Sequence, residues 1–434
     1  MDATDWVGVV VPTASGTSQT VATVSNPRAE VRISRSDHGH EGSIKMFSVL
    51  GLRVVFATTV LPDERANGGE ICSQEFIDVL RDNGADVRVV GYERVGRRPL
   101  QSDPSVYSAG PWFIEMADAG WRRIFWLART FITHAPFTQT KFKGTAYVRA
   151  LRNALRDGAD VLIIDHAHIG WIAELPDLPK RKLFIAHNLE HSLYNSIARH
   201  GSIAKRAIYA REARLLEARE AALGVECKAI VALSNADRDG IARLGVSTDK
   251  ITVIDLPGQA FDLSKLAPPK SYDIGLIGSW QWEVNRQGIR WFLAEVLPHL
   301  PNDLTVAIAG SGSETLSTTD PRLFKLGRVP DAGQFMRACR ALAVPTVVGS
   351  GIQLKTIEGI SVGVPMVVTP LALRGINDAP LHVRTAQTGV EFAKALTEAM
   401  TSSPTDAAPH WASRRRERFR ETLLSVFEQI GDAA

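Results

Sequence analysis

The chain has 434 residues, more than one domain of ordinary size holds, and this length predicts two domains. Its apolar content of 45%, charged content of 22% and net charge of +3 are typical of a soluble globular protein and do not indicate a nucleic-acid partner. Three widely spaced cysteines without neighbours at metal-ligand spacing predict reduced, buried thiols in the cytoplasm. No apolar run reaches the roughly 18 residues that span a bilayer, which disfavours an integral membrane or secreted protein.

Residues 1–50 are rich in Ser, Thr, Asp and Gly and lack lasting periodicity, which predicts a flexible extension with Met46 as a candidate functional start. Short apolar runs then alternate with amphipathic segments, which predicts a parallel sheet covered by helices on both faces. Strands are expected at residues 52–58, 86–90, 160–164, 182–186, 228–233 and 250–254, with helices at 70–83, 147–156 and 205–222.

A stretch rich in Pro and Gly, residues 257–270, predicts a linker, after which the alternation restarts. Strands are expected at residues 272–277, 304–309, 342–348 and 364–368, with helices at 285–299, 332–341, 353–362 and 390–400. Two such sheets predict an α/β protein of two Rossmann-like domains, residues 51–256 and 271–408, that bind ligands at the carboxyl ends of their strands and face a cleft.

Residues 409–434 predict one long amphipathic helix that begins with a cluster of arginines. The cluster consists of Arg414, Arg415, Arg416, Arg418 and Arg420. A solvated helix face is the favoured interpretation of this cluster.

The segment 348–370 combines a glycine turn with a helix that carries Lys355 and Glu358 three positions apart on one face. The helix N-terminus offers free N–H groups and a partial positive charge, Lys355 can neutralise phosphate, and Glu358 can accept hydrogen bonds from a ribose diol. These features predict a nucleoside diphosphate sugar site. The alternative is an ordinary surface pair of opposite charges.

The same segment resembles the donor-binding domain of retaining glycosyltransferases of the GT-B fold, in particular family 4. The residues that carry the resemblance are Gly351, Lys355, Glu358, Gly363 and Pro365. Ser350 departs from the pattern, because many members have an acidic residue there. The resemblance implies that residues 51–256 bind the acceptor, that residues 271–408 bind the donor, and that residues 409–434 pack back towards the first domain.

The resemblance also implies further donor-binding positions, most of them in turns. The full set is Gly68, Gly69, Ser279, Asn285, Gly310, Gly312, Gly351, Ile352, Lys355 and Glu358. For Asn285 a plain helix N-cap is an equal alternative. For Gly68 and Gly69 the alternative is a tight turn without a ligand.

His187 follows the strand predicted at residues 182–186, where a histidine can bind sugar hydroxyls or move a proton. A His-Asn-x-Glu sequence at this place is typical of one branch of family 4, so His187 is expected to act with Lys355 and Glu358 as the catalytic set. An acceptor-side group is expected at Asp165, His166, His168, Asn188 and Glu190. Hydrogen-bonded loop residues are an equal interpretation of the first three.

Residues 121–132 predict a helix with apolar residues on one face and arginines away from it. The apolar set is Trp121, Ile124, Phe125, Ala128 and Ile132. Packing of this face on its own domain is the favoured interpretation. Contact with an anionic membrane is the alternative, and it suits a lipid-linked acceptor.

The sequence therefore predicts a cytoplasmic glycosyltransferase that moves a sugar from a nucleoside diphosphate sugar to a glycan or glycolipid acceptor. Similarity to family 4 implies retention of anomeric configuration, with no metal or other cofactor required. Peripheral membrane contact remains open. Two alternatives are a sugar-nucleotide epimerase of the same fold and a non-catalytic nucleotide-sugar-binding protein.

Overall fold

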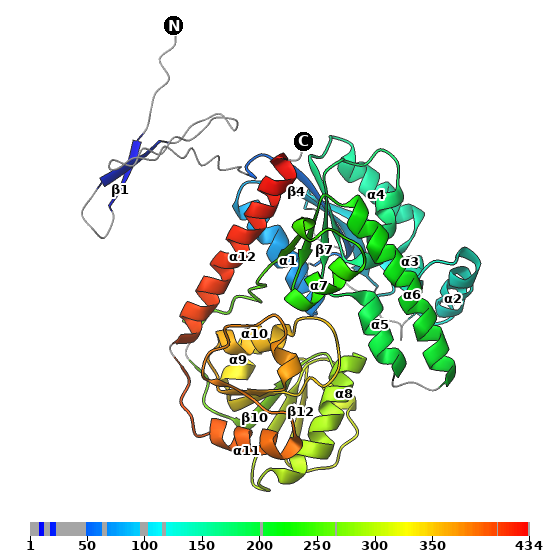
Figure 1. Cartoon of the computed structure of the whole chain (residues 1–434). Coiled ribbons are helices and arrows are strands. Elements are labelled where there is room, and N and C mark those ends of the chain that lie inside the picture. Colours follow the sequence, from blue (N-terminus) through cyan, green and yellow to red (C-terminus); the bar gives the residue numbers. More distant parts are fainter. Residues whose placement is uncertain are drawn as a thin grey trace.

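The computed structural model describes residues 8–12, 18–22, 49–62, 67–95, 103–114, 119–199, 203–264, 267–405 and 407–432. This part of the chain contains two large sheets of parallel strands, each flanked by helices. In Figure 1 the two sheets and their helices lie one above the other, and the long C-terminal helix runs along one side of both. The predicted α/β class with two Rossmann-like sheets is confirmed.

Most of the expected flexible extension, including Met46, lies outside the described residues. Within it, β1 (Gly8–Pro12) and β2 (Ser18–Ala22) pair antiparallel in a small sheet of their own. Of the helices described, none is both long enough and apolar enough to cross a bilayer.

The first large sheet has the strand order β5-β4-β3-β6-β7-β8-β9. Its strands are β3 (Arg53–Val60), β4 (Asp86–Arg94), β5 (Val106–Trp112), β6 (Val161–Asp165), β7 (Lys182–Ala186), β8 (Ala229–Ala232) and β9 (Ile251–Val253). Its helices are α1 (Gly68–Asp82), α2 (Arg122–Thr133), α3 (Phe137–Phe142), α4 (Thr145–Leu155), η1 (Ala167–Glu174), α5 (Glu190–Arg199), α6 (Ile203–Glu226), α7 (Asn235–Arg243) and η2 (Thr248–Lys250). The central strands β6 and β7 are buried along their whole length, as the uninterrupted apolar runs predict.

The second sheet has the order β12-β11-β10-β13-β14-β15. Its strands are β10 (Tyr272–Ile277), β11 (Val306–Ala309), β12 (Leu323–Gly327), β13 (Cys339–Val344), β14 (Met366–Val368) and β15 (Val383–Thr385). Its helical segments are α8 (Glu283–Trp291), η3 (Phe292–Val296), η4 (Leu297–His299), η5 (Ser313–Thr315), α9 (Ala332–Arg337), α10 (Leu354–Ser361), η6 (Pro370–Leu373) and α11 (Gly389–Ala399). Both faces of this sheet carry apolar cores.

The strands that the sequence analysis missed lie at sheet edges. β5, β12 and β15 are outermost strands, and each has part-exposed residues, so each lacks the continuous apolar run that marks an internal strand. β13 ends at Val344 although a strand was expected over residues 342–348. Pro345 follows it, and proline has no N–H to donate to a sheet ladder.

The C-terminal helix α12 (Ala407–Asp432) connects the two cores. Trp411 packs into a core of the second sheet, whereas Phe419 and the apolar residues after it join a core of the first. The rings of Phe419 and Phe76 meet edge to face with centroids 5.0 Å apart. Burial of these side chains holds α12 against both sheets.

The interpretation of the arginine cluster on α12 as a solvated face is wrong for its central members. Arg415 is 1% exposed, and its guanidinium donates to the carbonyls of Leu256 at 2.7 Å and Gly375 at 3.0 Å. Arg416 lies 2.7 Å from the Glu75 carboxylate. The local sequence gives the helix its charges, but the carbonyls of Leu256, just before the linker, and of Gly375, in the second sheet's domain, supply the acceptors for the buried Arg415.

The favoured interpretation of α2 is also wrong. The face expected to pack on the domain is exposed, including Trp121, Ile124 and Phe125, whereas Trp126 and Thr130 form the buried side. The period of the pattern predicts a helix, but the surrounding elements decide which of its faces is covered.

Candidate functional site

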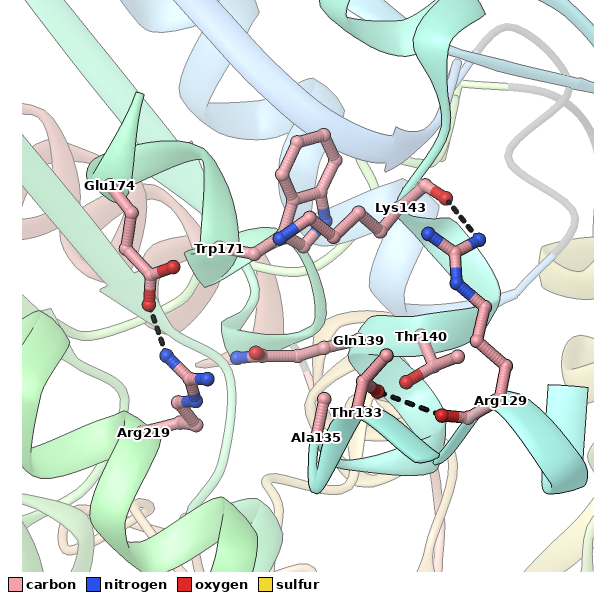
Figure 2. A pocket seen from close by; sticks show the side chains of 9 residues that line it. All are labelled: Arg129, Thr133, Ala135, Gln139, Thr140, Lys143, Trp171, Glu174 and Arg219. Atoms are coloured by element: carbon pink, nitrogen blue, oxygen red, sulfur yellow. Dashed lines mark hydrogen bonds and ion pairs between the residues drawn. The ribbon is translucent and has the colours of Figure 1, made fainter. Parts of the chain in front are cut away.

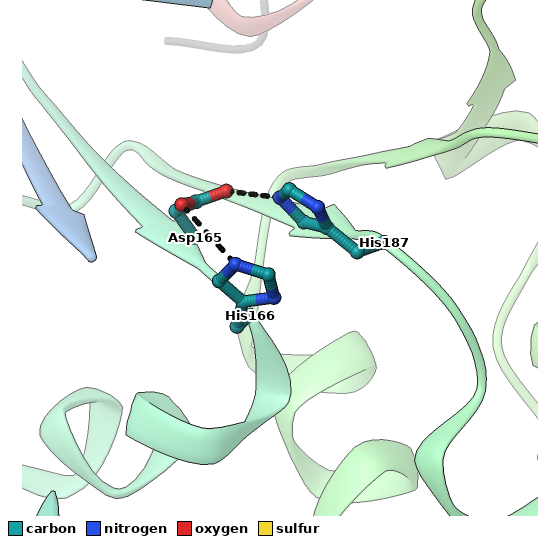
Figure 3. A group of neighbouring side chains, drawn as sticks. All are labelled: Asp165, His166 and His187. Carbon is teal, nitrogen blue, oxygen red and sulfur yellow. Dashed lines mark hydrogen bonds and ion pairs between the residues drawn. The ribbon is translucent and has the colours of Figure 1, made fainter. Parts of the chain in front are cut away.

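Asp165 is the last residue of β6 and His187 directly follows the adjacent strand β7, so parallel pairing brings both side chains to one sheet edge. Nε2 of His187 lies 2.6 Å from Oδ1 of Asp165. Figure 3 shows the carboxylate beside the two rings, with one contact to His187 and one to His166. The carboxyl edge of the first sheet therefore carries a hydrogen-bonded His-Asp pair.

The second oxygen of Asp165 is held by two hydroxyl groups. Thr58 Oγ1 donates to Oδ2 at 2.7 Å and Ser73 Oγ donates to it at 2.6 Å. Burial acts to raise the pKa of Asp165, but the neighbouring His187 and His166 and the hydrogen bonds with His187 and Ser73 lower it to about 2. The fully buried carboxylate is thus ionised and fixed in orientation.

His187 is held as the charged partner of this pair. Burial opposes its charge, but Cys72 and the Asp165 carboxylate, which both hydrogen-bond with the ring, raise its pKa well above 6.5. His166 stacks on His187 with ring centroids 3.7 Å apart. Burial and the charge of His187 lower the pKa of His166 to about 3, so this second ring is neutral.

Asp165, His166 and His187 also present one possible metal-ligand atom each, all within 4.8 Å of one another. The Asp165 oxygens, however, already accept hydrogen bonds from Thr58, Ser73 and His187. A cation would have to displace the His187 contact. The chemistry of this donor set favours a positioned histidine over a metal site.

The expected acceptor-side group separates into two kinds of residue. Asp165 is fully buried and Glu190 is 6% exposed, and their acceptor role stays a prediction. The Glu190 carboxylate lies 3.3 Å from Nε2 of His168. His166, His168 and Asn188 are part-exposed and stay candidates.

The N-terminus of α1 lies beside this edge. Asn67 caps the helix, and Gly68 and Gly69 form its first turn. A Cβ atom on Gly68 would come within 3.2 Å of Leu354 in α10, and one on Gly69 within 3.5 Å of His166. Gly68 therefore lies against the second sheet's domain and Gly69 against His166 of the first, and the donor role of both stays a prediction.

On α10, the side chains of Lys355 and Glu358 do not bond to each other. The alternative of a surface ion pair between them is therefore wrong. Lys355 Nζ donates to Oδ1 of Asn285 at 2.8 Å. Glu358 is 8% exposed, and its Oε1 is buried without a hydrogen-bond partner. Burial lowers the pKa of Lys355 to about 8 and raises that of Glu358 to about 7. The pKa values of both groups therefore lie close to neutral pH.

Asn285 links α10 to the turn after β10. The helix α8 begins at Glu283 with Trp282 as N-cap, so the N-cap interpretation of Asn285 is wrong. Its Nδ2 donates to the carbonyl of Ser279 at 2.8 Å while its Oδ1 accepts from Lys355. This amide fixes the Lys355 ammonium beside the Ser279 turn.

Gly310 and Gly312 shape the turn after β11, and both have positive φ angles, 108° and 86°. A Cβ atom on Gly310 would lie 2.0 Å from the carbonyl oxygen of Gly278, which no side chain allows. Close packing of the two turns therefore requires glycine at position 310. Ligand contact at either glycine stays a prediction.

The turn before α10 faces the first sheet. A Cβ atom on Gly351 would lie 3.8 Å from both the His187 carbonyl oxygen and Cβ of Asn188. Ile352 packs against cores of both sheets. Ser350 is buried, and its hydroxyl has no hydrogen-bond partner. The geometry thus brings the predicted donor turn next to the His187 edge.

Sequence analysis missed three residues of this site, Thr58, Cys72 and Ser73. Thr58 lies near the carboxyl end of β3, and Ser73 lies one helical turn after Gly69, to whose carbonyl it also donates at 3.0 Å. These positions at a strand end and a helix start are the signals that could have identified them.

Two Rossmann-like sheets whose ligand-binding ends meet in this way define a GT-B fold. Residues 67–257 match a family model described as Glycosyl transferase 4-like domain, and residues 271–402 match one described as Glycosyl transferases group 1. The chain belongs to the GT-B glycosyltransferases and resembles family 4. Compared with curated proteins, its sequence gives no match.

Solved structures show the same fold. WaaG, a glycosyltransferase involved in lipopolysaccharide biosynthesis, superposes with a TM-score of 0.56 at 15% identity, over 88% of this chain and 99% of WaaG. HepE from Anabaena, solved in complex with UDP, gives a TM-score of 0.53 at 14% identity, also over 88% and 99%. At these identities the likeness concerns the fold alone.

Proposed function

We propose that this glycosyltransferase moves a sugar from a nucleoside diphosphate sugar to a glycan or glycolipid acceptor, with retention of anomeric configuration. Residues 51–256 would bind the acceptor and residues 271–408 the donor. The observation that carries the proposal is the pair of functional groups on α10. The Lys355 ammonium is oriented by Asn285, and Glu358 has a buried oxygen without a partner, beside a turn that lies against His187.

In this proposal Lys355 and the N–H groups at the start of α10 bind the diphosphate. Glu358 Oε1 accepts a hydrogen bond from the ribose diol, which gives a partner to an atom that is otherwise costly to bury. As the diphosphate departs, its growing negative charge is stabilised by Lys355 and the helix dipole, so the mechanism requires no metal. HepE, with the same fold, has been solved in complex with UDP-glucose, which supports this class of donor.

His187 would contact the transferred sugar, with its ring orientation set by Asp165. The acceptor would approach from the side of His166, His168 and Asn188. A lipid-linked acceptor is presented at a membrane surface, so the proposal includes a cytoplasmic protein with peripheral membrane contact.

The test begins with a thermal-shift screen of the whole chain against nucleotide sugars, because a ligand that binds only the folded state raises the melting temperature. Each donor that binds is then incubated with candidate acceptors, and the product's anomeric configuration is read by NMR. Transfer with retention supports the proposal. A changed sugar without acceptor would indicate the epimerase, and binding without transfer or hydrolysis would indicate the binding protein, to which the hydroxyl of Ser350 in place of a carboxylate points.

A further inference from the structure

A cavity of about 120 Å³ lies among α2, α3, η1 and α6 in the first sheet's domain (Figure 2). Its volume is far above the roughly 10–15 Å³ that one water molecule requires. None of the residues that line it belongs to the donor or acceptor positions described above. The cavity is therefore a second place on this chain where a small molecule of several atoms fits.

The charged residues around this cavity leave it with an excess of positive charge. Three basic side chains, those of Arg129, Lys143 and Arg219, line it together with one carboxylate, that of Glu174. Glu174 forms an ion pair with Arg219, whereas no carboxylate of the described residues pairs with Arg129 or Lys143. Two cations without a counter-charge beside one cavity attract an anion.

These two cations are held close to each other and to the cavity wall. The guanidinium of Arg129 donates to the carbonyl of Lys143 at 3.5 Å, a contact that uses only part of its fork of N–H donors. Lys143 Nζ lies 5.6 Å from the centre of the Trp171 ring. Figure 2 shows Arg129 and Lys143 on one side of the cavity and Arg219 on the other. Positive groups thus border the space from two sides.

Two polar groups in the wall are buried and have no hydrogen-bond partner. They are Nε1–H of Trp171, which can only donate, and the hydroxyl of Thr140, and the two residues are 2% and 3% exposed. Trp171 belongs to η1 and Thr140 to α3, so two separate elements contribute such a group. A buried donor without an acceptor costs free energy, and native proteins rarely contain one unless a bound molecule accepts from it. Unpaired cations together with unpaired donors fit an oxyanion.

We propose that this cavity binds a free phosphate ion or the phosphate group of a small monoester. Arg129 and Lys143 would neutralise its charge, and the Trp171 N–H and the Thr140 hydroxyl would donate to its oxygens. Gln139, another wall residue, donates to the carbonyl of Ala167, the first residue of η1, at 3.0 Å. A bound anion would therefore hold η1 and α3 together. The inference concerns an anion in solution and holds whether or not the chain transfers sugar.

Calorimetry of the full chain in phosphate-free buffer, titrated with inorganic phosphate, tests this proposal. Lys143→Gln should weaken phosphate binding roughly tenfold or more, since a hydrogen bond to a charged group contributes on that order. Lys394→Gln on α11, also an exposed lysine, is the control and should leave binding unchanged. Phosphate binding that is lost in Lys355→Gln but kept in Lys143→Gln would place the ion at α10 and overturn the proposal.

Two threonines of α3 give a matched comparison. The hydroxyls of Thr138 and Thr140 are both buried without a partner, but only Thr140 lines the cavity. Valine removes such a hydroxyl and keeps the shape of the side chain, so Thr138→Val and Thr140→Val should both raise the melting temperature in phosphate-free buffer. Thr140→Val should weaken phosphate binding about fivefold, as expected for a neutral hydrogen bond, whereas Thr138→Val should keep the parent's affinity.

The same comparison in thermal-shift measurements gives a second readout. Phosphate should raise the melting temperature of the parent and of Thr138→Val equally, and that of Thr140→Val less, because only a bound ligand stabilises by mass action. Glycerol 3-phosphate and vesicles with phosphatidylglycerol distinguish a free ester from a lipid headgroup. Binding to vesicles alone, or equal phosphate affinity in parent, Lys143→Gln and Thr140→Val with unchanged circular dichroism, would overturn the proposal.

Discussion

Nε2 of His187 lies 2.6 Å from Oδ1 of a fully buried Asp165, whose other oxygen is held by Thr58 and Ser73. The carboxylate therefore cannot reorient without breaking several hydrogen bonds. Asp165 and Cys72 both hydrogen-bond with the His187 ring, and His166 stacks on one of its faces. The pair makes His187 a rigid, charged element of the site.

Asp165→Asn should lower the free energy of unfolding by about 3 kcal/mol, because it leaves the buried charge of His187 without its counter-charge. The raised pKa of His187 contributes stability that is fully present below pH 6.5. This stability is lost as pH rises through the pKa that His187 has in the folded protein. The lowered pKa of Asp165 contributes stability that is fully present above pH 3.8. This stability is lost as pH falls towards 2. The difference from parent should thus be largest between about pH 4 and 6.5. Urea unfolding measures it, with Asp239→Asn, at an exposed pair, as the control expected to stay within about 0.5 kcal/mol.

Glu358→Gln should weaken nucleotide binding by about 1.5–3 kcal/mol, the range for a hydrogen bond to a charged group. The substitution keeps size and helix propensity, so circular dichroism should not change. Calorimetry with UDP-glucose measures the affinity, and Glu398→Gln on α11, at an exposed ion pair, is the control. An unchanged dissociation constant in folded Glu358→Gln would remove the main support for the donor site.

The affinity for UDP-glucose should pass through a maximum between about pH 7 and 8. The Glu358 pKa of about 7 means that its acceptor form is lost below that pH, and the Lys355 pKa of about 8 means that its charge is lost above it. A nucleotide sugar is the correct probe, because the terminal phosphate of a free nucleotide titrates near pH 6. That titration would add a pH dependence of the ligand to that of the protein. In Glu358→Gln the loss of affinity below about pH 7 should disappear, while the loss of affinity above about pH 8 remains. A flat profile in the parent would contradict this assignment.

Arg415→Met should lower the free energy of unfolding by about 3 kcal/mol. The change removes a buried guanidinium and leaves the carbonyls of Leu256 and Gly375 without their donor. Arg414→Met is the matched control, since this neighbour is exposed, and it should change stability by no more than about 0.5 kcal/mol. Chemical denaturation compares the two. Equal effects would mean that the hydrogen bonds of Arg415 to Leu256 and Gly375 do not hold α12 in place.

His187→Ala should lower turnover far more than it lowers donor affinity, because its proposed contact is with the reacting sugar and not with the diphosphate. Steady-state kinetics and calorimetry on the same preparation separate the two effects. Equal turnover in variant and parent would refute the assignment. Equal losses of turnover and affinity would place His187 in donor binding only.

The sequence by itself determined the alternation of strands and helices, because buried parallel strands require continuous apolar runs and their helices an apolar stripe. The bounds of β7 and β10 and the start of α10 follow from local pattern and turn residues. The tertiary structure alone decided which partners meet. Thr58 and Ser73 reach Asp165 from about a hundred residues away, and Asn285 reaches Lys355 across 70 residues.

Which helix faces are exposed was likewise decided by the tertiary structure. The pattern of residues 121–132 predicts an apolar helix face, and that of residues 409–434 predicts a charged one, but the covering of each face depends on the elements that pack nearby. Hence the apolar face of α2 lies in solvent, while Arg415 of α12 is buried. A helix's periodicity is local, whereas its burial is decided by contacts between segments distant in sequence.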